Sequence, residues 1–131
     1  MCVCIEVGLD EGDAERVRVA IAKLPLQVSI HGRGWPWSRT TSLLISADGG
    51  CACSMFGDAD ELLAEHRESL ATVVEGLDGC LFGEKTLRAD WVGDKPTAEL
   101  ALTASDLANR IREGTFRQGI AYRVSWRGRA A

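Results

Sequence analysis

The chain has little of what marks a specialised class of protein. Its 131 residues include only 3 Pro, 1 Tyr, 2 His and a single Asn, and 46% of them are hydrophobic. This composition excludes a disordered tail and a fibrous repeat, and it is typical of a globular domain. No apolar run approaches the roughly 20 residues that a transmembrane helix requires. The opening residues 1–9 lack the basic start and cleavage site of a signal peptide, so the sequence predicts a cytoplasmic protein.

Positive charge is also scarce. The net charge of −4 provides no general excess of Lys and Arg for phosphate contacts, which argues against nucleic acid as a partner. Arg outnumbers Lys by 12 to 3, and we interpret this as the codon bias of a GC-rich, bacterial genome. Six of these arginines lie within residues 110–131, where Glu113 is the one acidic side chain. A basic surface is therefore expected at the C-terminal end alone.

The length and the hydrophobic pattern predict a single α+β domain over residues 1–131. Apolar and polar residues alternate at 1–9 and at 120–126, which indicates strands with one buried face. Further strands are predicted at 26–31, 42–47, 50–56, 86–92 and 97–103. Helices are predicted from Asp13 to before Pro25, over about residues 59–78, and from Thr103 to Gly114. The spacings Asp58/Glu61 and Thr103/Asp106 predict caps for the second and third helices.

The predicted order is β-α-β-β-β-α-β-β-α-β, and hairpins dominate its connections. Asp48-Gly49 predicts a hairpin of 42–47 with 50–56, and residues 93–96 predict one of 86–92 with 97–103. Since hairpins make antiparallel neighbours, we expect an antiparallel or mixed sheet with three helices mainly on one face. The first two-thirds are compatible with a split βαβ unit of the ferredoxin-like kind, which hosts too many functions to imply one. Trp91 and Trp126 continue apolar strand faces and are predicted core residues.

The most unusual feature is cysteine. Four of the five cysteines form two Cys-x-Cys pairs, Cys2 with Cys4 and Cys51 with Cys53. If the strands at 1–9 and 50–56 were neighbours, the four sulfurs would lie close together and could act as the ligands of a zinc ion. Side chains at i and i+2 of a strand, however, lie about 6.5 to 7 Å apart, whereas tetrahedral Zn–S bonds require sulfurs roughly 3.8 Å apart. The two pairs are also predicted to face opposite sides of the sheet. We therefore interpret the cysteines as small buried apolar residues and expect no metal and no cofactor.

An alternative site combines the second pair with a histidine. His66 lies between Leu62 and Leu70 on the predicted apolar face of the helix at 59–78, which favours a half-buried core residue. If that helix packs near the strand at 50–56, His66 supplies a nitrogen ligand or an acid–base group beside Cys51 and Cys53. These three residues form the alternative metal or thiol site.

The best functional candidate is the segment 31–39, which joins the strands 26–31 and 42–47. Its candidate binding residues are His31, Arg33, Trp35, Trp37 and Arg39. Trp and Arg are frequent in binding hot spots, and loops often carry function. We expect Trp35 and Trp37 to act as apolar anchors, with Arg33 and Arg39 facing an anion. The alternative is that both rings fold back over the open face of the sheet.

Two functional hypotheses follow from these patterns. The favoured one is a non-catalytic module that binds another protein, a small anionic ligand or a second copy of the chain through the segment 31–39. No nucleophile, base and orienting group can be assembled from motif spacing, which argues against an enzyme. The alternative is a thiol-dependent or soft-metal (zinc) protein that uses Cys51, Cys53 and His66. Neither nucleic acid nor a membrane is an expected partner.

Overall fold

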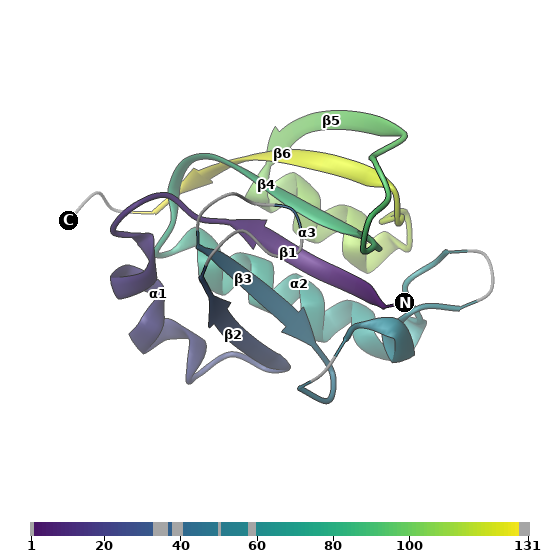
Figure 1. Ribbon diagram of the computed structural model, residues 1–131, viewed down its shortest axis with the longest axis horizontal. Helices are drawn as coiled ribbons and strands as arrows, with labels where there is room; N and C mark the ends of the chain where they lie inside the picture. The colour runs from purple at the N-terminus through teal and green to yellow at the C-terminus, as the bar shows by residue number, and fades with distance from the viewer. Residues whose placement is uncertain (1, 33–36, 38–40, 50, 58–59, 129–131) are drawn as a thin grey trace.

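The structure is a computed structural model that describes residues 2–32, 37, 41–49, 51–57 and 60–128. Within these residues the chain forms one small α+β domain (Figure 1). Its elements are β1 (Val3–Gly8), α1 (Asp13–Ile21), β2 (Gln27–His31), β3 (Ser42–Ser46), α2 (Ala64–Asp78), β4 (Phe82–Trp91), β5 (Ala98–Thr103), α3 (Ala104–Glu113) and β6 (Ile120–Arg127). A short 3-10 helix, η1 (Cys53–Met55), precedes α2.

All six strands belong to one mixed sheet, in the order β2-β3-β1-β4-β6-β5. Neighbouring strands are antiparallel except β5 and β6, which run parallel and are connected through α3. From β1 to β4 the order and directions are those of a ferredoxin-like unit, because β1 and β2 run the same way on either side of β3. The predicted fold class is confirmed.

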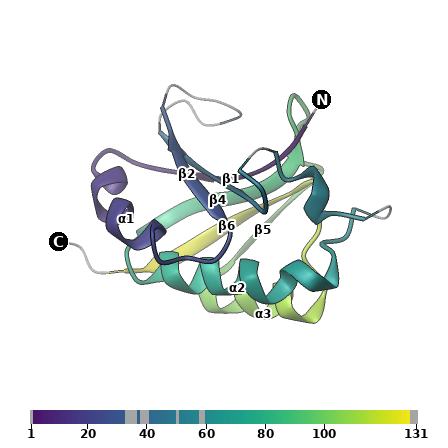
Figure 2. The same cartoon turned by 90° about the horizontal axis from the view of Figure 1, so that it is seen from below.

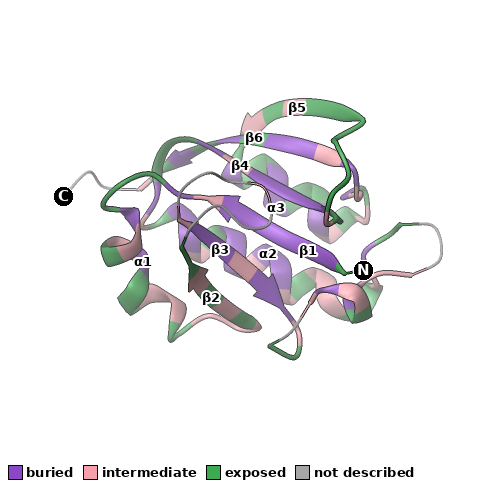
Figure 3. Ribbon diagram, in the orientation of Figure 1, coloured by how far each residue is buried: buried purple, intermediate pink, exposed green. Residues whose placement is uncertain are grey.

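The helices form a second layer under the sheet. Helices α2 and α3 lie side by side against one face, and α1 packs beside α2 and β2 (Figure 2). The core between the layers includes the fully buried Leu43, Leu70, Leu87, Leu107 and Tyr122. Strand β1 is buried along most of its length, whereas the edge strand β5 is largely exposed (Figure 3). Among the described residues, no helix is long and apolar enough to cross a bilayer.

The local sequence signals of α3 and β6 are confirmed. The hydroxyl of Thr103 accepts a hydrogen bond of 3.0 Å from the backbone N–H of Asp106 and caps α3. Gly114 ends that helix with a φ of 80°, in the left-handed region that favours glycine. In β6, Tyr122, Val124 and Trp126 are buried, while the alternating Arg123 and Ser125 are exposed. One face of β6 packs against the helices, as its alternation predicts.

The predicted strand at 50–56 is wrong. Residues 51–57 form a loop around η1, and no part of this segment belongs to a named strand. The predicted hairpin with 42–47 would require a free edge on β3. That edge does not exist, because β3 already lies between β2 and β1. The segment instead crosses the start of β1 at Val3, where it forms the site described below.

The start of the long helix and the second predicted hairpin also need correction. Helix α2 begins at Ala64 rather than near residue 59, because Glu61 is held in a backbone bridge with Arg117 before the helix starts. Asp58, the predicted cap of that helix, lies outside the described residues. Strands β4 and β5 do not pair, because α3 carries the chain back and inserts β6 between them. Trp91 ends β4 and is 39% exposed, so it is not a core residue.

Candidate functional site

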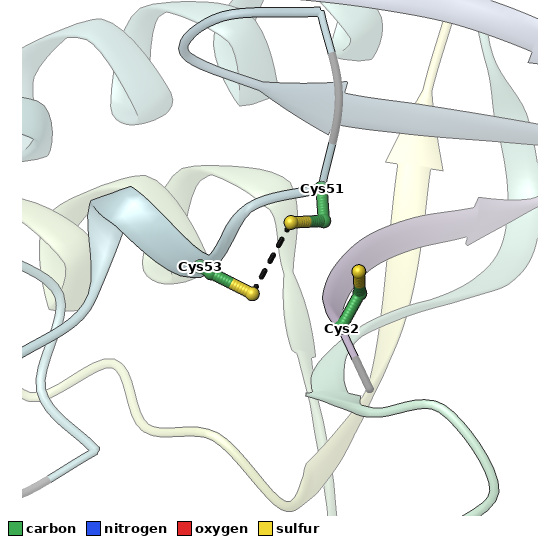
Figure 4. Close-up of side chains that lie close together, drawn as sticks. All are labelled: Cys2, Cys51 and Cys53. Carbon is green, nitrogen blue, oxygen red and sulfur yellow. Dashed lines mark hydrogen bonds between the residues drawn. The ribbon is translucent and has the colours of Figure 1, made fainter.

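Three cysteine side chains meet where the loop after β3 crosses the start of β1. The Sγ atoms of Cys2, Cys51 and Cys53 all lie within 4.8 Å of one another, and we call these residues the three-thiol cluster. The thiol of Cys51 donates a hydrogen bond to the Sγ of Cys53, with the two sulfurs 3.2 Å apart. Figure 4 shows the three side chains turned toward one another from these two segments.

Backbone hydrogen bonds hold the two segments of the cluster together. The N–H of Ala52 donates to the carbonyl of Val3 at 2.8 Å. The N–H of Val3 in turn donates to the Sγ of Cys53 at 3.2 Å. The loop is therefore attached to Val3 of β1 through Ala52 and Cys53, although it forms no strand.

The turn at Ala52 explains why the geometric objection to a metal site does not hold here. That objection assumed an extended backbone, which separates i and i+2 side chains by about 6.5 to 7 Å. Ala52 instead has φ −91° and ψ 13°, outside the extended region, so Cys51 and Cys53 turn toward each other. Cys4 does not belong to the cluster. It lies within β1 and is only 4% exposed.

The thiols differ in acidity because their surroundings differ. The pKa of Cys51 is lowered, chiefly by a hydrogen bond from the backbone of Cys53 and then by the side chains of Cys53 and Cys2. The pKa of Cys2 is raised, chiefly because its thiol is the hydrogen-bonding partner of Cys51. Burial raises the pKa of Cys4 to about 11. Within the pair formed by Cys2 and Cys51, the first proton therefore leaves Cys51.

A pocket of about 230 Å³ opens beside the cluster, on the face of the sheet away from α2 and α3. Its side chains come from β1, β2, β3 and the loop after β3, and include Cys2, Cys4, Ser29, His31, Ser46 and Cys51. We call it the thiol pocket. It is larger than a cavity of about 150 Å³ that holds benzene, so it has room for a small organic molecule.

His31 lies at the far end of the thiol pocket from the cluster. Strand register places His31 opposite Ser42, and Ser42 opposite Gly8 of β1. Six residues of β1 therefore separate this level from Cys2, a distance of about 20 Å along the strand. The imidazole Nε2 lies 3.0 Å from the hydroxyl of Ser29. His31 is thus a lining residue of the pocket and not a fourth member of the cluster.

His66 does not belong to the three-thiol cluster either. It lies in the first turns of α2, where it is half-buried. In the part of the chain that the structure describes, Cys51 and Cys53 are grouped with Cys2 instead of His66. Sequence reasoning missed this role of Cys2, because it placed the two cysteine pairs on opposite sides of the sheet. The paired Cys-x-Cys spacing was the available signal.

The segment 31–39 is described at His31, Gly32 and Trp37, and the predicted binding residues Arg33, Trp35 and Arg39 lie outside the described residues. Trp37 lies over the open face of the sheet. Its backbone N–H donates to the carboxylate of Glu6 at 3.2 Å, and its ring centroid is 4.2 Å from the guanidinium carbon of Arg88. The use of this segment for binding stays a prediction.

Comparisons of the chain with family models, with curated proteins and with solved structures gave no match. The functional argument therefore depends on the geometry of the thiols and the pocket.

Proposed function

We propose that this protein binds a soft metal ion, Zn²⁺ or Cu⁺, through the thiolates of Cys2, Cys51 and Cys53. The observation that carries the proposal is the mutual approach of the three sulfurs to within 4.8 Å. Zn–S bonds of about 2.3 Å in a tetrahedral site require sulfurs roughly 3.8 Å apart. A contraction of about 1 Å therefore converts the cluster into a ligand set, which side-chain rotation alone can provide.

The chemistry of the donors favours a soft ion. Thiolates select Zn²⁺, Cu⁺ and iron–sulfur clusters, whereas Mg²⁺ and Ca²⁺ take oxygen ligands. Of Cys51 and Cys2, Cys51 is the first to provide a thiolate, because its pKa is lowered while that of Cys2 is raised. The hydrogen bond from the Val3 N–H to Cys53 is the kind of outer contact that orients a metal ligand.

A bound ion would keep one coordination position for a ligand from outside the cluster. Among the described residues, no His, Asp, Glu or further Cys joins the three sulfurs at the same range. Structural zinc sites close all four positions with protein side chains, whereas sites that exchange ligands keep three. We therefore propose an exchangeable metal site rather than a zinc that holds the fold together. The large apolar core supports this, because none of the three cluster cysteines belongs to it.

Metal titration of the reduced, metal-free chain tests the proposal. We expect one Zn²⁺ per chain in competition with a chelating dye, and Co²⁺ should give the absorption of cobalt–thiolate bonds. Cys51→Ser and Cys53→Ser should each weaken Zn²⁺ binding by about a hundredfold or more, because the few ligands share all of the binding free energy. Cys80→Ser is the matched control, since Cys80 lies outside the cluster. Binding that is unchanged in both cluster variants, or absent from the reduced protein, would refute the proposal.

We propose as a second function that the segment 31–39 binds a protein, a small anionic ligand or a second copy of the chain. The supporting observation is that His31, its first residue, lines the thiol pocket. The double variant Trp35→Ala, Trp37→Ala should keep most of the stability while losing self-association or ligand binding. Sedimentation and urea denaturation distinguish these outcomes, and a variant that unfolds would mean that the rings only cover the sheet.

A further inference from the structure

Cys51 and Cys53 differ in their access to small molecules. Cys51 lines the thiol pocket, whereas Cys53 is not among its lining residues. The Sγ of Cys53 accepts hydrogen bonds from the Val3 N–H and from the Cys51 thiol, which hold it beside the Sγ of Cys51. With 3.2 Å between the two sulfurs, only a short approach separates them from a covalent S–S bond of about 2.05 Å.

We propose that the metal-free protein exchanges thiols with small-molecule disulfides, with Cys51 as the attacking thiol and Cys53 as the resolving thiol. This activity goes beyond metal binding, because it needs two of the three sulfurs and no ion. The substrate class is a small disulfide, such as oxidised glutathione or bis(2-hydroxyethyl) disulfide, of which one half occupies the thiol pocket.

The exchange is balanced in two steps. Cys51 gives its proton to solvent, and its thiolate attacks one sulfur of the small disulfide. The S–S bond of the substrate breaks, a mixed disulfide forms on Cys51, and the other half leaves as a thiolate that takes up a proton. Cys53 then loses its proton and attacks the Sγ of Cys51, which releases the second half as a thiol. Two protein thiols are oxidised to one disulfide, and one small disulfide is reduced to two thiols.

The conformation at Ala52 makes the second step feasible. A Cys-x-Cys disulfide is strained on an extended strand, because the Cα separation lies near the upper limit for a disulfide. Here φ −91° and ψ 13° at Ala52 bring the sulfurs to the same side before any bond forms. The first step needs space next to Cys51 for the small-molecule half of the mixed disulfide, and the thiol pocket provides that space.

The test uses the full chain, reduced and kept in chelator, with a pulse of oxidised glutathione followed by acid quenching and mass spectrometry. Trypsin leaves Cys51 and Cys53 on one peptide, residues 40–67, because no Lys or Arg separates them. We expect that peptide to lose two hydrogens. A peptide 40–67 cross-linked to residues 1–16, which hold Cys2 and Cys4, would show that the partner is a cysteine of the N-terminal segment and would overturn the proposed pair.

Two serine variants test the order of attack. Cys53→Ser should accumulate a stable mixed disulfide with one glutathione on Cys51. Cys51→Ser should react at Cys53 at least about tenfold more slowly, because Cys53 does not line the thiol pocket that receives the substrate. Equal rates in the two variants, or a Cys53→Ser protein that forms no mixed disulfide, would contradict the assigned roles.

A third variant separates this proposal from the proposed function. Cys2→Ser removes one metal ligand but neither exchanging thiol, so it should weaken Zn²⁺ binding while the disulfide of Cys51 with Cys53 still forms. Loss of exchange in Cys2→Ser would show that all three thiols act together and would overturn the two-thiol assignment. If the wild-type chain binds Zn²⁺ but does not exchange thiols, the exchange proposal is refuted and the metal proposal stands. If it exchanges thiols but does not bind Zn²⁺, the metal proposal is refuted and the exchange proposal stands.

Discussion

Trp126→Ala should destabilise the protein far more than Trp91→Ala, although both residues continue apolar strand faces in the sequence. Trp126 is 3% exposed, and its indole N–H donates to the carbonyl of Lys85 at 3.1 Å. Removing a buried Trp costs about 3 to 5 kcal/mol, and loss of this hydrogen bond adds about 1 kcal/mol. Trp91 is 39% exposed at the end of β4, so its truncation should cost no more than about 2 kcal/mol.

Urea denaturation followed by far-ultraviolet circular dichroism measures both costs, provided that each variant unfolds in one transition with an unchanged m-value. Circular dichroism is preferred to fluorescence, because each variant removes one of the 4 tryptophans. A Trp91→Ala cost equal to or above that of Trp126→Ala would refute the assignment of these positions to the rim and the centre of the core.

Three further predictions concern the metal, the thiols and a helix cap. EDTA should leave the chain folded, and unfolding in EDTA would instead indicate a structural metal. Zn²⁺ at a hundredfold excess over its dissociation constant should raise the free energy of unfolding by about 2.7 kcal/mol. Cys4, whose pKa burial raises to about 11, should resist iodoacetamide at pH 8 while Cys51 is modified, and fragmentation of the tryptic peptides should find the label on Cys51 and not on Cys4. Thr103→Ala should cost about 1 kcal/mol in urea denaturation through loss of the cap on α3, and Thr103→Ser should restore most of it.

Elements with strong local signals were predictable from the sequence. The alternation at 120–126, the cap at Thr103 and the glycine at 114 depend on neighbours in the chain, and all three appear in the structure as expected. The strand at the N-terminus and the class of the sheet follow from the same kind of signal. These features are decided by side-chain periodicity and backbone preference, which can be recognised within a few residues.

Pairing between distant segments was not predictable in the same way. Cys51, Cys53 and Met55 alternate as in a strand, yet β3 has no free edge for them, because β1 and β2 occupy both of its sides. The hairpin expected between β4 and β5 fails because β6 competes for the same edges. The three-thiol cluster depends on this long-range outcome and on the turn at Ala52, which has no sequence signature.

X-ray absorption spectroscopy at the metal edge of the zinc-loaded protein tests the central claim most directly, because it counts the sulfur ligands of the bound ion. The proposal predicts three sulfurs at about 2.3 Å and one lighter oxygen or nitrogen donor. Cys80→Ser should leave this spectrum unchanged, whereas Cys2→Ser should reduce the sulfur count by one. A first shell of oxygen and nitrogen alone, or one with a single sulfur, would contradict a metal site built from Cys2, Cys51 and Cys53.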